Sequence, residues 1–294
     1  MPTDHLTLFL KALEAVDYAR SRGAPGLAFD AFGRALGRKL HLAGIRYGLS
    51  YLLTPVNIVR YWEFPFTWAY LPKEDGDFLD VSSPRMFDLF AAAYRPKSRI
   101  TVLNPDPRDL AETSQIAQAA GLSNLTCRQD SVESLATSPN TYDCIWSISV
   151  IEHISGRYDD SQAIQWMYNA LKPGGRLILT FPVDRELITE TRDKDYYGTQ
   201  EPLPNGQYFF YRRYDLQAIK ERLLKPLNHP AHDMQFFGET TRGRYLEYES
   251  RWVAGGASVT VEDPREIADH YRSYEKWEEM PGLGICGLVI TKPF

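Results

Sequence analysis

YDCIWSISVIEH, residues 142–153, is the stretch that decides the fold class, and LKPGGRLILT at residues 171–180 supports it. The apolar residues of the first stretch are continuous rather than alternating, which is typical of a central strand in a parallel sheet. A helical pattern over residues 161–171 ends at a Pro-Gly-Gly turn, and a second buried strand follows from Arg176. Polar residues follow the first strand at its carboxyl end, where ligands bind in open parallel sheets.

The alternation of strand and helix extends toward the N-terminus from this pair. Strands are predicted at residues 78–81, 99–104 and 125–129, and helices at residues 85–95 and 107–120 lie between them. Strands that alternate with helices of this length indicate βαβ units and a parallel sheet. The sequence therefore predicts an α/β fold with a Rossmann-like, doubly wound sheet.

The C-terminal third completes the predicted sheet. Residues 284–291 form a last buried strand, and the sixth strand comes from residues 234–237 or from residues 245–252. A helix is predicted to begin at Asp263 and to continue past Tyr271 and Tyr274, which recur at helical spacing. The prediction is a seven-stranded sheet, mostly parallel, with an antiparallel last strand.

Three parts of the chain are distinguished by these patterns. Residues 1–72 are mostly helical in pattern and are predicted to form an N-terminal helical cap. Residues 73–226 are predicted to be the cofactor-binding core. Residues 227–294 are predicted to complete the sheet and to cover the substrate site.

Composition and charge exclude several classes of protein. The 294 residues are 44% hydrophobic and 24% charged, which is typical of a soluble globular protein. The net charge is -5 and no basic block offers a footprint for phosphates, so no nucleic acid partner is expected. Three scattered cysteines predict neither a disulfide framework nor a metal site. No apolar run is long enough to span a membrane, so a cytoplasmic location is expected. The oligomeric state is left open, with a homo-oligomer as one alternative.

The order and spacing of these segments over residues 76–183 carry a family resemblance. The strand that ends at Glu152-His153 and the Lys-Pro-Gly-Gly turn before Arg176 resemble the fourth and fifth strands of class I S-adenosylmethionine-dependent methyltransferases. The resemblance implies an enzyme that uses S-adenosyl-L-methionine as cofactor. It also implies methyl transfer to a small-molecule substrate, such as a metabolite, a glycan or a lipid precursor.

The first turn of the core departs from the pattern of the family. The family has Asp-x-Gly-x-Gly-x-Gly there, whereas this chain has Asp80, Val81, Ser82 and Ser83 followed by Pro84. The resemblance assigns cofactor binding to these four residues before the proline. Serine is small but, unlike glycine, it disfavours a positive φ. An ordinary turn between strand and helix is the alternative interpretation.

Further cofactor contacts are implied at the ends of the next three strands. Asn104 stands where a ribose-binding carboxylate is usual, and its amide can accept one hydrogen bond and donate another. A turn and a helix start are the alternative for Asn104. Asp130 and Ser131 correspond to an adenine-binding position, with a helix cap as the alternative. Ser147 and Ile148 fall where the family makes backbone contacts to the cofactor.

His153 is the predicted catalytic residue, because it lies at the ligand-binding edge and histidine is the usual base near neutral pH. The alternative is that it only packs or orients the loop. Aromatic residues crowd the segment after strand five, including Tyr196 and Tyr197, and are predicted to fold over the site. The predicted substrate-binding residues are Glu152, Trp62, Glu63, Tyr211 and Arg212. Arg212 and Arg213 are assigned to an acidic acceptor, with surface ion pairing as the alternative for at least one of them. Core packing is the alternative for each aromatic residue.

Two other functions compete with methyl transfer. The missing glycines and Asn104 favour a cofactor-binding or catalytically inactive methyltransferase-like partner protein. A nicotinamide-dependent oxidoreductase fits less well, because the dinucleotide-binding glycine fingerprint is absent.

Overall fold

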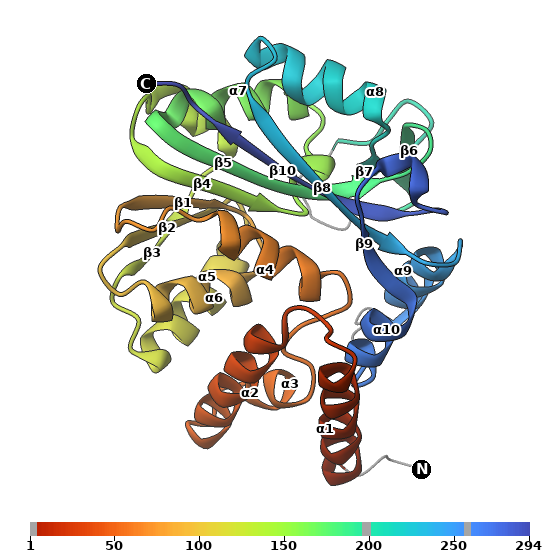
Figure 1. Ribbon diagram of the computed structural model, residues 1–294. Coiled ribbons are helices and arrows are strands. Elements are labelled where there is room, and N and C mark those ends of the chain that lie inside the picture. The colour runs from red at the N-terminus through yellow and green to blue at the C-terminus, as the bar shows by residue number, and fades with distance from the viewer. Residues whose placement is uncertain (1–4, 196–200, 256–259) are drawn as a thin grey trace.

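A twisted sheet separates two layers of helices in the computed structural model, which describes residues 5–195, 201–255 and 260–294, with residues 252–255 by their backbone alone (Figure 1). Tyr196 and Tyr197 lie outside the described residues. The described strands form an eight-stranded sheet in the order β3-β2-β1-β4-β5-β10-β8-β9, and a separate two-stranded sheet.

The first five strands of the large sheet are parallel, as predicted. They are β3 (Leu125–Gln129), β2 (Arg99–Asn104), β1 (Asp77–Val81), β4 (Tyr142–Ile148) and β5 (Leu171–Val183). Every residue of β4 except Asp143 is buried, which agrees with its continuous apolar pattern. Strands β2 and β3 lie on one side of β1, whereas β4 and β5 lie on the other side. The direction in which the chain adds strands therefore changes between β1 and β4. Ligands bind at such switch points, beyond the carboxyl ends of the strands.

Three strands with antiparallel neighbours extend the sheet beyond β5. They are β10 (Gly284–Thr291), β8 (His232–Glu239) and β9 (Tyr271–Tyr274). Gly287 of β10 lies against helix α4 (Arg60–Tyr70), where an added Cβ would stand 2.3 Å from the Phe66 ring. Glycine at this position therefore allows the helix to approach the sheet closely.

In this half the structure decides between the two alternatives for the sixth strand and corrects two expectations. The sixth strand includes residues 234–237, whereas residues 245–252 belong to helix α9 (Arg244–Gly255). The predicted helix through Tyr271 and Tyr274 is wrong, because α10 (Asp263–His270) ends before them and β9 follows. Their helical spacing is overridden by pairing with β8, in which both tyrosines are buried and Tyr271 stacks on Phe237. The sheet thus has eight strands rather than seven.

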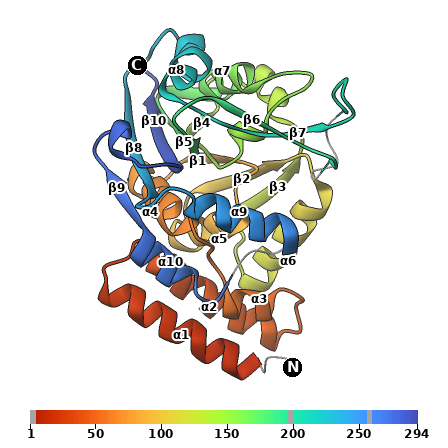
Figure 2. The same cartoon turned by 90° about the vertical axis from the view of Figure 1, so that its right-hand side faces the viewer.

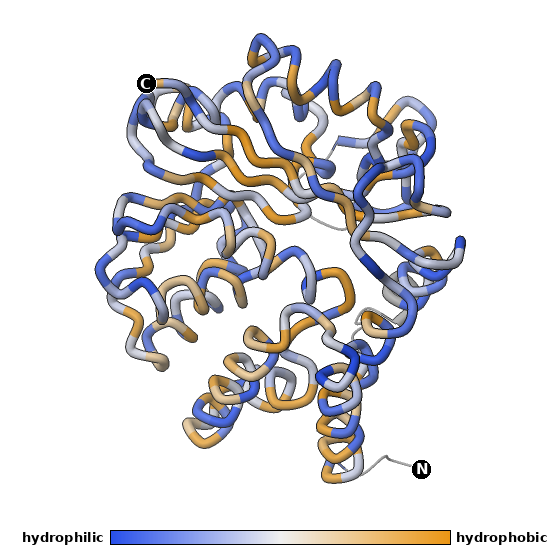
Figure 3. Tube along the Cα trace, viewed as in Figure 1, coloured by the Kyte–Doolittle hydropathy of each residue, from blue (hydrophilic) through white to orange (hydrophobic). Residues whose placement is uncertain are grey.

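The two faces of the sheet bury separate apolar clusters. One face packs against α7 (Asp160–Ala170) and the helical turns that follow β7. The other face packs against α4 and α5 (Arg85–Tyr94). Figure 3 shows the apolar colouring concentrated along the central strands, between these layers. The arrangement confirms the predicted doubly wound α/β fold.

The helices before α4 lie together at the bottom of the molecule in Figure 2, beneath α10. They are α1 (His5–Ser21), α2 (Leu27–Leu42) and α3 (Gly48–Leu53). α1 packs against α10, and the Tyr18 hydroxyl donates a hydrogen bond of 2.8 Å to Asp269. The first and last predicted parts of the chain are therefore in contact. The boundaries at residues 72/73 and 226/227 stay a prediction.

The remaining elements connect the strands and helices already described. They are α6 (Pro107–Ala120), α8 (Leu216–Ala218), β6 (Ile188–Arg192), β7 (Tyr208–Arg213), a π-helical turn Ile219–Leu224 and 3-10 turns at Val132–Thr137, Ile151–His153, Lys225–Leu227 and Trp277–Glu279. None of the helices in the described ranges is long and apolar enough to cross a bilayer.

Candidate active site

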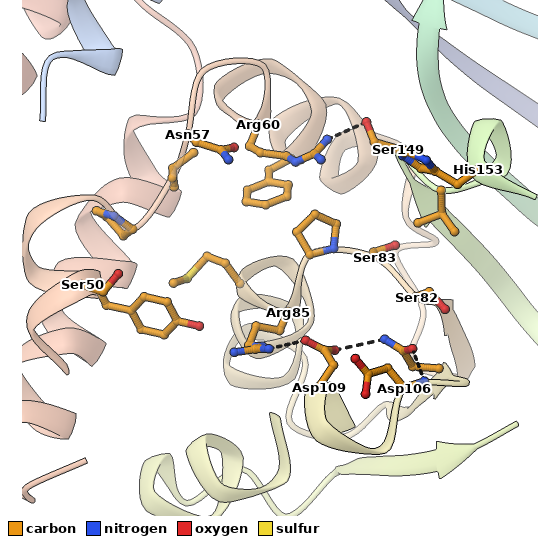
Figure 4. A pocket seen from close by; sticks show the side chains of 18 of the residues that line it. Ser50, Asn57, Arg60, Ser82, Ser83, Arg85, Asp106, Asp109, Ser149 and His153 are labelled. Carbon is orange, nitrogen blue, oxygen red and sulfur yellow. Dashed lines mark hydrogen bonds and ion pairs between the residues drawn. The ribbon is translucent and has the colours of Figure 1, made fainter. Parts of the chain in front are cut away.

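Two cavities meet at the carboxyl ends of β1, β2 and β4. The large cavity has a volume of about 670 Å³ and is lined by the loops after these strands and by the segment from α3 to α4 (Figure 4). Its volume falls within the range of roughly 300–1,000 Å³ usual for ligand pockets. The small cavity, of about 160 Å³, shares Asn57, Arg60, Ser149 and His153 with the large one.

The turn after β1 takes a glycine-like course without glycine. Ser82 has φ 55°, and its N–H and hydroxyl both donate to the Leu103 carbonyl, at 2.9 and 3.1 Å. The Ser83 hydroxyl accepts from the Ile148 N–H at 2.9 Å, and Asp80 accepts from the Ser83 N–H at 3.0 Å. These bonds hold Ser82 in the left-handed region, which is sparsely populated by residues other than glycine. The turn therefore lines the large cavity in a conformation that suits a cofactor loop.

Buried carboxyls support this turn from beneath. Asp80 is completely buried, and burial raises its pKa to about 7. Asp88 of α5 is also completely buried, and burial, with the nearby Asp80, raises its pKa well above the usual range. The Trp146 indole donates to Asp88 at 3.1 Å, and the Ser147 hydroxyl donates to the Val81 carbonyl at 3.1 Å. Asp80 and Val81 thus shape the turn, whereas Ser82 and Ser83 line the cavity.

Acceptor groups gather where β2 ends. Asn104 lines the large cavity beside Asp106 and Asp109. The Asn104 amide donates to Asp109 at 3.0 Å, and Arg85 forms an ion pair with the same carboxylate (Figure 4). Asp106 caps α6 by accepting from the Arg108 N–H at 2.9 Å. Asp109 and Arg85 were not predicted from the sequence, although Asp109 lies in the first turn of the predicted helix at residues 107–120.

The residues predicted beyond β3 and β4 lie in different surroundings. Asp130 and Ser131 are outside the lining of the large cavity, and Asp130 accepts from the Ser131 N–H at 2.9 Å. Ser147 and Ile148 are buried, and the Ile148 N–H is used by Ser83. The cavity is lined instead by the next residue, Ser149, which has φ 49°. The residues after β4 that line the cavity therefore begin one residue later than the predicted pair, whose cofactor contacts stay a prediction.

A buried polar network separates the two cavities from the core. Glu63 is completely buried and forms an ion pair with Arg60. The Ser149 hydroxyl donates to Glu63 at 2.6 Å, and the Thr180 hydroxyl donates to the same oxygen at 2.7 Å. Arg60 also donates to the Ser149 hydroxyl at 2.6 Å (Figure 4). Glu63 thus holds Arg60 and Ser149 in place rather than lining a cavity, and Arg60 was missed because it precedes the aromatic cluster without any motif.

His153 lies where the two cavities meet. Its Nδ1 is 2.7 Å from the Phe210 carbonyl oxygen, which can only accept, so Nδ1 carries the proton and Nε2 the lone pair. Burial lowers the pKa of His153 to about 4. The imidazole is therefore neutral at pH 7, and it can accept a hydrogen bond at Nε2.

Glu152 lines the small cavity next to His153. Its side chain is 3% exposed, and its Oε2 is buried with no hydrogen-bond partner among the described residues. Burial raises the pKa of Glu152 well above its usual range. The rest of the lining comes from residues on both sides of the fold, namely Asn57, Val59, Arg60, Ser149, His153, Pro182, Phe210, Tyr211, Tyr245, Tyr248 and Glu249. Tyr245, Tyr248 and Glu249 belong to α9 and were not predicted.

Trp62 and Arg212 are not among the residues that line either cavity. Trp62 stacks on Phe66 and Phe237, with ring centroids 4.9 and 5.5 Å away, and lines a separate cavity of about 630 Å³ near α10. Arg212 donates to the Ile154 carbonyl at 2.8 Å and lies 3.8 Å from Asp160. The structure therefore brings Glu152, Tyr211 and His153 together but leaves Trp62 and Arg212 elsewhere. The described residues contain no group of three or more His, Cys, Asp or Glu suited to a metal ion.

Comparison with known proteins decides the family of the central segment. Residues 79–179 match the family model described as Methyltransferase domain. Residues 79–179 are a methyltransferase domain. The match confirms the predicted resemblance to class I S-adenosylmethionine-dependent methyltransferases, and with it the predicted enzyme class. A search of the curated proteins found no relative by sequence.

Solved structures share the fold of the chain around this methyltransferase domain. Coclaurine N-methyltransferase is 10% identical, with a TM-score of 0.50 over 78% of this chain and 68% of its own. The YcgJ protein of Bacillus subtilis is 16% identical, with a TM-score of 0.50 over 78% of this chain and 97% of its own. Phosphoethanolamine N-methyltransferase 2 of Haemonchus contortus is 14% identical, with a TM-score of 0.50 over 79% of this chain and 52% of its own. At these identities the likeness is one of fold.

Proposed function

We propose that this methyltransferase binds S-adenosyl-L-methionine in the large cavity and transfers its methyl group to a small molecule held in the small cavity. The observation that carries the proposal is the junction of the two cavities at Arg60, Ser149 and His153, at the carboxyl edge of the sheet. A donor and an acceptor held on the two sides of this junction would be adjacent. Holding two reactants in this way is the main contribution an enzyme makes to a displacement reaction.

The residues of the large cavity fit the cofactor. The left-handed Ser82 allows the β1 turn to pass close to a ligand, and Ser83 adds only a small side chain. Asn104, Asp106 and Asp109 present oxygen acceptors where ribose hydroxyls would bind. S-adenosylmethionine supplies, when bound, a methyl group that is already activated on a sulfonium. The structural relative from Haemonchus contortus was solved with this cofactor, which supports the proposal.

The proposed role of His153 is to position the acceptor. Its Nε2 can accept a hydrogen bond from a hydroxyl or amine, while the bond from Nδ1 to Phe210 fixes the ring. With a pKa near 4 the ring is a weaker proton acceptor at pH 7 than an ordinary histidine. His153→Ala is expected to leave cofactor affinity within a few-fold and to lower turnover sharply. Unchanged turnover would return His153 to a packing role.

Calorimetry with S-adenosylhomocysteine, S-adenosylmethionine and NADH tests the proposal. We expect both sulfur compounds to bind and NADH to fail. Asp109→Ala is expected to weaken binding of both at least tenfold. Glu186→Gln, at an exposed position that lines neither cavity, is the control. Absence of binding at millimolar concentration would refute the proposal. Binding without transfer to any acceptor of a broad panel would favour the inactive partner protein instead.

A cytoplasmic location and the oligomeric state stay predictions.

A further inference from the structure

We infer that the small cavity selects a basic amine, so that the reaction is methylation of nitrogen. The inference rests on the proposed function and names its acceptor class. It is carried by the surplus of carboxyls, the aromatic lining and the size of this cavity.

The carboxyls that line the small cavity outnumber its available cations. Arg60 is the lining arginine, and its charge is offset by the ion pair with buried Glu63. Glu152 and Glu249 remain, with side chains 3% and 14% exposed. Arg192 reaches Glu249 only at 3.7 Å and is shared with Glu190 at 3.2 Å. A cation that enters this cavity therefore meets two carboxyls that the lining arginine does not neutralise, and its positive charge favours their ionised form.

Glu152 needs a donor that the described part of the protein does not provide. Its Oε2 is buried without a hydrogen-bond partner there, and its Oε1 is 4.0 Å from His153 Nε2, beyond hydrogen-bonding distance. Leaving such a group unsatisfied typically costs about 1–3 kcal/mol. A bound amine would satisfy Oε2 of Glu152, because its N–H donates a hydrogen bond inside the cavity that Glu152 lines.

The aromatic lining also favours an amine. Tyr211, Tyr245 and Tyr248 contribute to the wall together with Phe210. Faces of aromatic rings attract ammonium groups, and the attraction grows when water is excluded. A dry cavity of about 150 Å³ is known to hold benzene, and this cavity has about 160 Å³. The expected acceptor is therefore a small amine with a group no larger than one ring inside the cavity.

An acidic acceptor, to which Arg212 was assigned from the sequence, lacks a comparable partner. Arg212 is held by the Ile154 carbonyl and by Asp160. Arg213 is paired with Glu190 at 3.0 Å and with Asp184 at 3.4 Å. Neither arginine is among the residues that line the small cavity.

Proton transfer follows from the same groups. The amine enters as an ammonium ion and must lose one proton before its nitrogen lone pair can react. The nitrogen then forms a bond to the methyl carbon while the carbon–sulfur bond breaks, and that electron pair leaves on sulfur as a neutral thioether. The bound ammonium keeps Glu152 ionised, and burial raises the pKa of Glu152 so that its carboxylate accepts a proton more readily than an ordinary glutamate. Glu152 can therefore take the first proton and pass it to water. The product leaves as a methylated ammonium ion.

The test compares ligands that differ in one functional group. Benzylamine, benzyl alcohol and benzoate are titrated into the protein saturated with S-adenosylhomocysteine, and cyclohexylamine and 2-phenylethylamine are compared with their alcohol and carboxylate analogues. We expect at least one amine to bind tenfold or more tightly than both of its analogues. Equal or tighter binding of the alcohol or the carboxylate in every set would overturn the inference.

A substitution tests the residue that carries the argument. Glu152→Gln keeps the shape of the side chain but removes its charge, and we expect it to reduce the amine preference to less than threefold. Its affinity for S-adenosylhomocysteine is expected to stay within twofold, which shows that the variant is folded. Glu186→Gln, at an exposed position, is expected to keep the full preference. An unchanged preference in Glu152→Gln would contradict the assigned role. Failure of the unaltered protein to bind S-adenosylhomocysteine would instead refute the proposed function.

Discussion

Replacing Glu63 by glutamine removes one charge from a buried ion pair beside the active site. Glu63 is completely buried, whereas the Arg60 side chain is 20% exposed. Glutamine keeps an oxygen that can accept from the Ser149 and Thr180 hydroxyls. The substitution therefore isolates the loss of the charge that faces Arg60.

The expected loss of stability follows from the burial of this pair. Removing one partner of a buried ion pair costs roughly 3–5 kcal/mol, because the other charge is left uncompensated. Partial exposure of Arg60 places this case near the lower end, at about 3 kcal/mol. At about 2 °C per kcal/mol for a chain of this size, the melting temperature should fall by about 6 °C.

Thermal unfolding followed by circular dichroism at pH 7 measures this change. Glu186→Gln is the matched control, because its side chain is exposed and the expected change is within about 0.5 kcal/mol. Arg60→Met and the double variant complete a double-mutant cycle, and we expect a coupling energy of about 2 kcal/mol. A loss below about 1 kcal/mol in Glu63→Gln, or additivity in the cycle, would refute the reasoning.

Three further outcomes are expected. Ser82→Val should lower the free energy of unfolding by about 2 kcal/mol, because a β-branched residue resists φ 55°. Ser82→Gly should change it by less than about 1 kcal/mol. Urea unfolding measures both, and equal effects would contradict the strain argument. The folded-state pKa of His153, about 4, lies below the unfolded value of 6.5, so its contribution is present above pH 6.5 and is lost as the pH falls toward 4. At about 1.4 kcal/mol per pKa unit the loss approaches about 3 kcal/mol, and urea unfolding of His153→Gln from pH 7.5 to 4.5 should show a flatter profile than the parent protein. Trp62→Phe should lower the free energy of unfolding by about 2 kcal/mol, because the ring stacks on Phe237. It should leave binding of S-adenosylhomocysteine and of amines within twofold, since Trp62 lines a different cavity. Weaker ligand binding in calorimetry would restore its predicted substrate role.

Local sequence patterns were sufficient for the parallel half of the fold. The continuous apolar run of β4 specifies a strand buried on both faces, and Gly121 at φ 79° ends α6 where predicted. The same reasoning failed at Tyr271 and Tyr274, because their spacing suits a helix and only the edge of β8 makes a strand more stable. Such pairing joins residues 32 to 38 positions apart and leaves no local signal.

The candidate site shows the same division. The sequence placed His153, Glu152 and the β1 turn at the carboxyl edge, since the topology of a parallel sheet determines where strands end. It did not determine that hydrogen bonds to Leu103 and Ile148 hold the serine turn in a glycine-like conformation.

The sequence by itself determined the parallel core, its methyltransferase-like order of motifs and the edge at which ligands bind, because these depend on periodicity and strand direction. Tertiary structure alone decided which side chains face the cavities. It brought α9 from the C-terminal part to the cavity that Glu152 lines, and it paired Arg60 with Glu63. It also turned Trp62 and Arg212 toward other partners. Burial and charge compensation of this kind depend on neighbours distant in the chain, so the character of the acceptor cavity exists only in the folded protein.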